Sequence, residues 1–288
     1  MAKKEAVFIL LGQSNAVGHK LAMRDDDVIK KPMKNVYGLS RDKNQSFSST
    51  ELEWSGYTSF GMNLAEEQDN TYSIVNCLAN HWQRHIDAGN KYDLPNLYIV
   101  QIAIGAQGVG DGYMWNPTKE KKLIPGKLGI VDISLFSFAQ HIFKLIDDSF
   151  SKMGKEYEII GLHWRGGESD MRTTTEYLLK NLKNIYVEIF DEFNRILKNP
   201  PIVLHKIVAY DRAKDIDATG MCLKNIDVIN NVFKEIQEEY KNVSIFDVRS
   251  FPGYIPDVRC NGMFMTDAVH FTEEVNDWIA ESILKEQV

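Results

Sequence analysis

The stretch AVFILLGQSNAVG, residues 6–18, decides the fold. Its first half is a short, unbroken apolar run, which is typical of a strand buried on both faces of a parallel sheet. The run is shorter than the apolar core of a signal peptide, and it leads into a polar motif at Gly12 instead of a cleavage site. The stretch therefore predicts a buried first strand that ends in a tight turn at Ser14.

The same kind of apolar run recurs along the chain. Short runs rich in β-branched residues predict buried strands at 7–11, 97–104, 159–163, 202–208 and 243–248. Longer segments between them carry apolar residues at helical spacing, most clearly at 177–196, 223–236 and 275–283. Strands that alternate with amphipathic helices indicate a parallel sheet covered by helices on both faces.

Length and composition set the broad class. The 288 residues suffice for one large α/β domain, and no break in composition divides 1–288 into two. Residues 19–70 are rich in Asp, Asn, Ser and Lys, and they predict a long irregular excursion over the surface. The net charge of −7 argues against nucleic acid or an anionic membrane as a partner. No stretch has the length of a membrane span, and the sequence leaves the oligomeric state open.

The cysteines and the N-terminus bear on the compartment. Cys77, Cys222 and Cys260 are odd in number, widely spaced and without a Cys-x-x-Cys pair. This favours buried thiols in a reducing compartment over a disulfide framework or a zinc site. Together with the missing signal peptide, it predicts a cytoplasmic protein. A protein exported without a signal, such as a phage component, would have the same features.

Ser14 is the first candidate for chemistry. A serine at a sharp turn from a strand to a helix exposes its hydroxyl at the carboxyl edge of the sheet, and Gly12 permits such a turn. Backbone amides beside the serine would then face a developing oxyanion. The alternative is an ordinary turn in which Ser14 caps the helix.

Asp267 and His270 are the second candidates, in TDAVHF at 266–271, just before the last predicted helix. A nucleophilic serine needs a base that takes its proton, and the base needs a carboxylate that orients it. Three residues apart on one turn, the two side chains can both face the end of the first strand.

Two loops follow predicted strands. GLHWRGGESD at 161–170 combines two glycines with two carboxylates, which marks an active-site loop more often than packing. A tight turn before a capped helix accounts for Ser169 and Asp170, but not for Trp164 and Arg165. IGAQGVGDG at 104–112 lacks both the Lys-Ser/Thr of a P-loop and dinucleotide-binding spacing. It fits a glycine amide directed at an oxyanion better than a phosphate cradle.

Two sets of residues offer metal ligands in principle. His81 and His85 are four residues apart on one helical face, and His163, Glu168 and Asp170 lie close in the sequence. No nearby motif supplies further ligands to either set. We therefore expect no metal, and we expect His81 and His85 to form part of a solvated or half-buried helix face.

Taken together, the four candidate segments resemble the SGNH hydrolases, in the branch of sialate O-acetylesterases and acetylxylan esterases. Gly-Gln-Ser-Asn at 12–15 is similar to the first block of that branch, and Gly105 lies where the second block has its glycine. Residues 164–170 resemble Trp-x-Gln-Gly-Glu-Ser-Asp, and 267–270 match the closing Asp-x-x-His. The blocks follow family order over nearly the whole chain. The resemblance implies a flavodoxin-like, three-layer α/β/α sandwich with a parallel sheet.

The resemblance also implies roles. Ser14 would be the nucleophile, His270 the general base and Asp267 the residue that orients it. The amides of Ser14 and Gly105 would form the oxyanion hole. Supporting or substrate-binding positions would be Gln13, Asn15, Trp164, Gly166 and Glu168. Family substrates are acetyl esters on sugars, attacked without a metal or an organic cofactor.

Gly166 departs from the family pattern. The third block of the family has a glutamine there, whose side chain donates to the oxyanion. Loss of one such donor typically lowers turnover about 100- to 1,000-fold. Gln107 or Arg165 could supply the missing donor from another backbone position. Otherwise the enzyme would be slow, or the chain would have become a binding protein.

The sequence therefore predicts a serine esterase acting on an acetylated carbohydrate or another small ester. Aromatic residues that could stack on sugar rings are Trp54, Tyr57, Tyr113 and Trp115. One alternative is a catalytically weak carbohydrate-binding or structural protein on the same scaffold, which only Gly166 favours. Another is a lipid or thioester hydrolase, which predicts a wide apolar cleft.

Overall fold

A computed structural model describes residues 3–18, 28–44, 48–65, 71–118, 134–208, 222–255 and 269–287. They contain a seven-stranded sheet in the order β3-β2-β4-β1-β5-β6-β7. Its strands are β1 (Glu5–Gly12), β2 (Val36–Leu39), β3 (Trp54–Gly56), β4 (Leu97–Ala103), β5 (Tyr157–Arg165), β6 (Ile202–His205) and β7 (Val243–Phe246). Neighbouring strands are parallel, except that β3 is antiparallel to β2.

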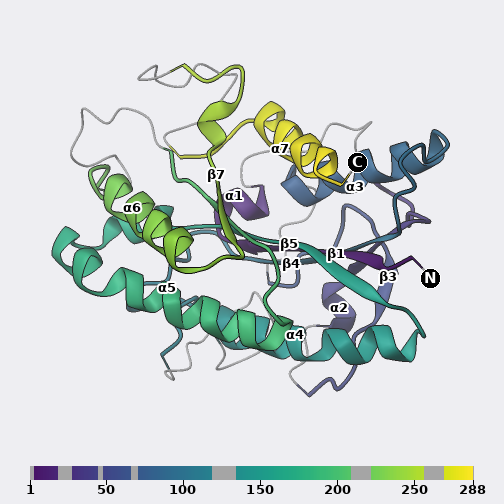
Figure 1. Cartoon of the computed structure of the whole chain (residues 1–288), viewed down its shortest axis with the longest axis horizontal. Coiled ribbons are helices and arrows are strands. Elements are labelled where there is room, and N and C mark those ends of the chain that lie inside the picture. The colour runs from purple at the N-terminus through teal and green to yellow at the C-terminus, as the bar shows by residue number, and fades with distance from the viewer. Residues whose placement is uncertain are drawn as a thin grey trace.

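Helices cover both faces of the sheet (Figure 1). They are α1 (Ser14–Val17), α2 (Arg41–Asn44), α3 (Ile74–Asp87), α4 (Leu135–Lys152), α5 (Thr175–Leu197), α6 (Asn225–Glu239) and α7 (Glu273–Lys285). Along β1, Val7, Ile9 and Leu11 belong to the core under α4, α5 and α6. The alternate residues Phe8 and Leu10 belong to the core under α3 and α7. The predicted three-layer α/β/α sandwich is confirmed.

Strand β1 lies at the point where the strand order reverses. The order β4-β1-β5-β6-β7 is that of a flavodoxin-like sheet, in which ligands bind outside the carboxyl ends of the strands at this point. Gly12, the last residue of β1, pairs with Ala103 of β4 on one side and with Arg165 of β5 on the other. The segments that follow these strands therefore meet at one edge of the sheet.

The prediction of an irregular surface excursion over 19–70 is wrong in part. Strands β2 and β3 lie within it, and Val36 and Leu39 of β2 are fully buried. β2 pairs with β4, and β3 continues the sheet beyond it. The two strands are too short for a periodicity signal, and their pairing with a strand about 60 residues away makes them extended.

Local signals account for the long helices. Ser134 and Thr174 stand before α4 and α5, and each side chain accepts a hydrogen bond from the backbone N–H three residues on. Lys198 ends α5 in a left-handed conformation, with φ of 61°. Both helices then bury one apolar face, which in α5 consists of Leu178, Leu182, Tyr186, Ile189, Phe190, Phe193 and Leu197.

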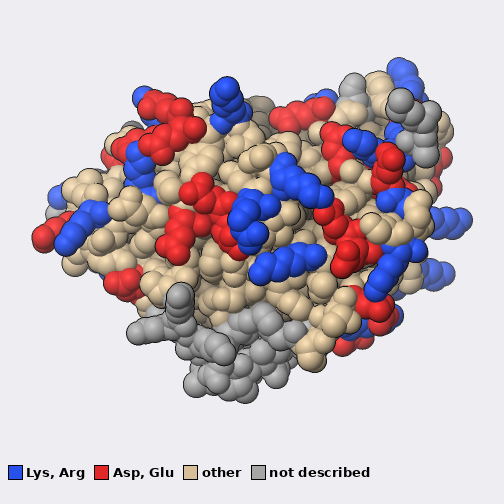
Figure 2. Space-filling model, turned by 60° about the horizontal axis from the view of Figure 1, so that its bottom comes forward, with Lys and Arg blue, Asp and Glu red and all other residues tan. Residues whose placement is uncertain are grey.

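The surface carries mixed charge. Figure 2 shows acidic and basic side chains interspersed on the face that comes forward there. Exposed pairs such as Lys183 with Glu235 are of the kind that contributes little to stability. No helix in the described part of the chain is long and apolar enough to cross a membrane.

Candidate active site

Ser14 lies two residues after the end of β1 and opens the one-turn helix α1. Gln13 occupies the N-cap position, so the hydroxyl of Ser14 is not the cap that the alternative interpretation requires. Gly12 has φ of 144°, and a Cβ at this position would lie 1.9 Å from the carbonyl oxygen of Arg165. Only glycine allows β1 and β5 to approach this closely. The close approach sets Ser14 beside the end of β5.

Glu168 joins the segment after β5 to the segment around Ser14. Its carboxylate accepts a hydrogen bond from Gln13 Nε2 and another from Asn15 Nδ2, each at 2.6 Å. The backbone N–H of Ser169 donates in return to Gln13 Oε1 at 3.2 Å. Glu168 is only 4% exposed. The predicted supporting residues Gln13, Asn15 and Glu168 therefore lie together in the structure. Gln13 and Asn15 are the neighbours of Ser14 in the sequence.

Asn15 also holds the turn that carries His270. Its Nδ2 donates to the carbonyl oxygen of Val269 at 2.8 Å, and its Oδ1 accepts from the N–H of Phe271 at 3.3 Å. These bonds grip the backbone immediately before and after His270, which is itself partly exposed. The tertiary structure thus brings two turns together that are more than 250 residues apart. Asp267 lies outside the described residues.

Arg165 lies beneath these turns. Its Nη1 donates to the carbonyl oxygen of Asn15 at 3.1 Å and to Asn276 Oδ1 at 2.6 Å. The guanidinium carbon is 4.8 Å from the centre of the Phe271 ring, a cation–π arrangement. Burial lowers the pKa of Arg165 to about 10, so the side chain is still a cation at neutral pH. Its bonds support α1 and α7.

Two residues of this support were not predicted from the sequence. Asn276 of α7 bonds to Arg165 and donates to the carbonyl oxygen of Tyr72, while Phe271 covers the guanidinium. The signal for Asn276 was available, because it is a polar residue on the apolar face that Val275 and Ile279 define. Sequence alone does not show which partner such a residue meets.

The loop after β4 contributes Gly105 and Gln107. Ala106 between them is exposed and has φ of 60°, a left-handed conformation that costs a non-glycine residue about 1–3 kcal/mol and tends to occur at functional sites. Gln107 Oε1 accepts a hydrogen bond from the N–H of Met114 at 3.2 Å. That bond holds the side-chain amide of Gln107 by its oxygen, so Nε2 is the end that can donate to another group.

Trp115 and Trp164 lie beneath the site as a pair. Trp115 is fully buried and Trp164 is 1% exposed, and their rings meet edge to face at 5.0 Å. Trp115 Nε1 donates to the carbonyl oxygen of Gly12 at 3.0 Å, directly below the turn at Ser14. The prediction that Trp115 stacks on a sugar is therefore wrong, and so is that for the buried Tyr57. Both tryptophans support the turn.

His163, Glu168 and Asp170, which offer metal ligands in principle, do not converge on one point. His163 Nδ1 lies 2.9 Å from His205 Nε2, Glu168 binds the amides beside Ser14, and Asp170 binds backbone N–H groups. Elsewhere in the described residues, His81, Asp277 and Glu281 have ligand atoms within 4.8 Å of one another. These side chains already pair, His81 with Asp277 at 2.9 Å and Glu281 with Lys285 at 3.2 Å.

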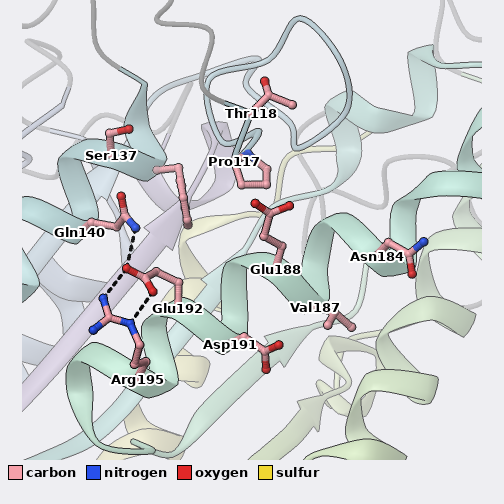
Figure 3. A pocket seen from close by; sticks show the side chains of 11 residues that line it. Pro117, Thr118, Ser137, Gln140, Asn184, Val187, Glu188, Asp191, Glu192 and Arg195 are labelled. Atoms are coloured by element: carbon pink, nitrogen blue, oxygen red, sulfur yellow. Dashed lines mark hydrogen bonds and ion pairs between the residues drawn. The ribbon is translucent and has the colours of Figure 1, made fainter.

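A pocket of about 710 Å³ lies between α4 and α5, beside Pro117 and Thr118 (Figure 3). Carboxylates line it, and Glu192 among them is held by Arg195 and Gln140. None of its lining residues belongs to the predicted site.

Solved structures share this architecture. A protein from Arabidopsis thaliana matches with a TM-score of 0.59 at 16% identity, over 99% of this chain and 100% of its own. NanS matches with 0.61 at 14% identity, over 99% and 98%. The chain has the SGNH-hydrolase fold. A carbohydrate acetylesterase from Xanthomonas citri matches with 0.52 at 12% identity, over 96% of this chain and 54% of its own.

At these identities the likeness establishes the fold alone. No family model matches the sequence, and no curated protein does.

Proposed function

We propose that this protein is a serine esterase that removes short acyl groups, acetyl above all, from a carbohydrate. The observation that carries the proposal is the pair of hydrogen bonds by which Asn15 holds the backbone on both sides of His270. Asn15 is the neighbour of Ser14 in the sequence. One side chain therefore joins the turn of the candidate nucleophile to the turn of the candidate base.

In the proposed mechanism, Ser14 Oγ attacks the ester carbonyl carbon while His270 takes the hydroxyl proton. Asp267 orients His270 and stabilises the imidazolium. The tetrahedral intermediate collapses as His270 returns the proton to the departing sugar oxygen, and the acetyl group stays on Ser14. A water that His270 deprotonates then attacks the acyl-enzyme, which releases acetate and restores the serine.

The backbone amides of Ser14 and Gly105 are the proposed oxyanion donors, with Gln107 Nε2 as a third. Gln107 suits this role better than Arg165, because the bonds of Arg165 run to α1 and α7. The left-handed conformation of Ala106 supports the assignment, since strain of this kind is often stored where a loop must present its amides to a ligand.

A carbohydrate ester is the proposed substrate class. The carbohydrate acetylesterase from Xanthomonas citri shares the fold, which supports a sugar acetate. Tyr113, half-buried on the loop after β4, is the aromatic side chain best placed to contact a sugar ring there. A longer acyl chain or a thioester would instead favour the lipid or thioester hydrolase predicted as an alternative.

Replacement of Ser14 by alanine tests the proposal. Ser14→Ala should abolish turnover of p-nitrophenyl acetate, leaving about 10³-fold catalysis over water, and it should leave the melting temperature nearly unchanged. Ser151→Ala, an exposed serine on α4, is the matched control and should keep wild-type activity. A fluorophosphonate probe should label Ser14 in the wild type, as mass spectrometry of the digested protein would show.

Two results would decide against the proposed function, and a panel of substrates tests its specificity. If Ser14→Ala keeps half of the wild-type rate, the mechanism is wrong. If the wild type turns over no ester and yet binds acetylated glycans, the binding-protein alternative that Gly166 favours is correct. Acetate release from a panel of acetylated glycans, set beside p-nitrophenyl esters of increasing chain length, separates a sugar esterase from a lipid or thioester hydrolase.

A further inference from the structure

Asp170 has a fully buried carboxylate with no evident part in the proposed chemistry. It lies in the 3-10 turn Glu168–Arg172 after β5. Its Oδ1 accepts the N–H of Gly110 at 2.8 Å and that of Val109 at 3.0 Å, and its Oδ2 lies 3.2 Å from the N–H of Val109. The carboxylate therefore holds the loop after β4 by its backbone.

The loop is shaped to lie on this carboxylate. A Cβ at Gly108 would come within 2.4 Å of Asp170 Oδ1, and a Cβ at Gly110 would come within 3.3 Å. At Gly108 in particular, a side chain would push the loop off the carboxylate. This explains glycines that fit neither a phosphate cradle nor a dinucleotide site.

The same loop carries two of the three proposed oxyanion donors. Gly105 and Gln107 precede the segment that Asp170 holds. The carbonyl oxygen of Gly108 accepts the N–H of Trp115 at 3.2 Å, and the Trp115 indole binds Gly12 below Ser14. The loop is thus fastened to Asp170 through Val109 and Gly110, and to the Ser14 turn through Trp115.

We propose that Asp170 is a positioning residue: its ionised carboxylate sets the 105–110 loop against Ser14, and protonation of that carboxylate turns the esterase down at acid pH. The inference rests on the proposed function in one respect, namely that Gly105 and Gln107 bind the oxyanion. A charge-assisted hydrogen bond is about twice as strong as a neutral one. Protonation therefore weakens the bonds to Val109 and Gly110 together.

The surroundings place this ionisation within the working range of an enzyme. Burial, together with the nearby charge of Glu168, raises the pKa of Asp170 to about 7, although the two amides oppose the shift. Among the described residues, Tyr113 on the loop and Tyr177 and Tyr186 on α5 are the other ionisable groups that interact with Asp170.

The pH profile of kcat/KM tests the catalytic part. Two protonations, of His270 and of Asp170, should make the acid limb of the wild type approach a slope of 2 on logarithmic axes. Asp170→Asn should reduce that slope to 1 and lower kcat about 100-fold or more with little change in KM, because the oxyanion donors on the loop act only in the transition state. Asp148→Asn, an exposed carboxylate on α4 and away from this loop, should leave both slope and kcat unchanged.

A second measurement does not depend on activity. In protein labelled with ¹⁵N-glycine and ¹⁵N-valine, the amide resonances of Gly110 and Val109 should titrate together between pH 5 and 9. They should do so in wild type and in Ser14→Ala, and Asp170→Asn should abolish the titration. The wild-type titration and the wild-type pH profile answer the question even if Asp170→Asn fails to fold.

The outcomes separate the two proposals. A titrating Gly110 in a protein without esterase activity at any pH overturns the proposed function but keeps the link between Asp170 and the loop. An active enzyme with a slope of 1, or with wild-type kcat in Asp170→Asn, overturns the positioning role. A Gly110 resonance that does not move with pH overturns the link itself.

Discussion

Gly166 and Gly167, two adjacent glycines after β5, differ in whether their position accepts a side chain. A Cβ at Gly166 would make ordinary contacts of 3.6 Å with Gly12 Cα and Trp164 Nε1, and its φ is not positive. Gly167 differs, since its φ is 127° and a Cβ there would lie 2.5 Å from Ile207 Cδ1. Backbone strain therefore excludes a side chain at 167 and allows one at 166, so a substitution at Gly166 probes chemistry instead of folding.

We predict that Gln107→Ala lowers kcat about 10- to 100-fold with little change in KM, because the lost donor acts on the oxyanion and not on the bound ester. Gly166→Gln should be neutral if Gln107 is the third oxyanion donor, as the proposed mechanism has it. Steady-state kinetics on p-nitrophenyl acetate measure both effects, and thermal melts show whether each variant is folded.

Gln237→Ala, an exposed glutamine on α6, is the control for removal of an amide side chain and should have wild-type kinetics. Compensation by Gln107 is refuted if Gln107→Ala keeps wild-type kcat while Gly166→Gln raises it. That result would mean that the protein works with an incomplete oxyanion hole.

At the scale of elements, α1 is a single turn that depends on its neighbours. A helix this short has no stability of its own. Arg165 of β5 supports it from below through the carbonyl oxygen of Asn15, and Asn276 ties the same guanidinium to α7. The Asn15 side chain joins α1 to the turn before α7. The candidate nucleophile and the candidate base are therefore positioned by contacts between elements.

We predict that Asn15→Ala lowers both activity and stability. The substitution leaves the buried carboxylate of Glu168, the carbonyl oxygen of Val269 and the N–H of Phe271 each short of one partner. An unsatisfied buried group costs about 1–3 kcal/mol, so with three such groups the free energy of unfolding should fall by at least roughly 3 kcal/mol. Urea denaturation measures this loss, and kcat should fall at least 10-fold as the His270 turn is released.

Asn231→Ala on the exposed face of α6 is the matched control and should change neither quantity. The hydrogen bonds from Asn15 to the His270 turn are not needed for catalysis if Asn15→Ala loses stability but retains wild-type kcat. In that case the His270 turn is held by other contacts, and the observation that carries the proposed function loses its force.

At the scale of the whole molecule, a histidine pair lies inside the sandwich. His163 of β5 and His205 of β6 are 3% and 4% exposed, and their ring nitrogens lie 2.9 Å apart. Burial lowers the pKa of His163 to about 3 and that of His205 well below its usual value. Both rings are therefore neutral in the folded protein. Asp170 acts in the opposite sense, because its pKa is raised to about 7.

We predict that the protein loses stability as the pH falls from about 6.5 toward 3. In this range the unfolded chain binds protons at both histidines and the folded chain does not, so each contributes up to about 1.4 kcal/mol per pH unit. Above pH 6.5 their contribution is fully present. Asp170 is protonated in the folded state and ionised in the unfolded one between about pH 3.8 and 7, which offsets part of the loss.

Urea denaturation at a series of pH values measures the net slope. His205→Phe, which places a ring of similar size against His163 and Phe246, should reduce that slope by up to about 1.4 kcal/mol per pH unit. It should also lower stability at pH 7.5, because His163 Nδ1 loses its partner. An unchanged slope in this variant would show that the pair does not control acid stability.

The sequence by itself determined the class of fold and the segments of the site. The apolar runs at 7–11, 97–104 and 159–163 predicted the central strands β1, β4 and β5, since a strand buried on both faces needs an unbroken apolar run. The ends of those strands then indicated where Ser14, Gly105 and Glu168 would meet. The inferences about the strands succeed because they depend on local composition, and the expected meeting place rests on a general rule about parallel sheets.

Only the tertiary structure decided which side chains contact one another. Strand β2 exists because β4 pairs with it, and Glu168 binds both Gln13 and Asn15 because β5 lies beside β1. Asn15 bonds to the His270 turn, and Asp170 bonds to the loop after β4. In both cases the hydrogen bonds join residues that are remote in the sequence. Sequence patterns do not predict such pairs, because the packing of the whole chain determines which polar groups are buried together.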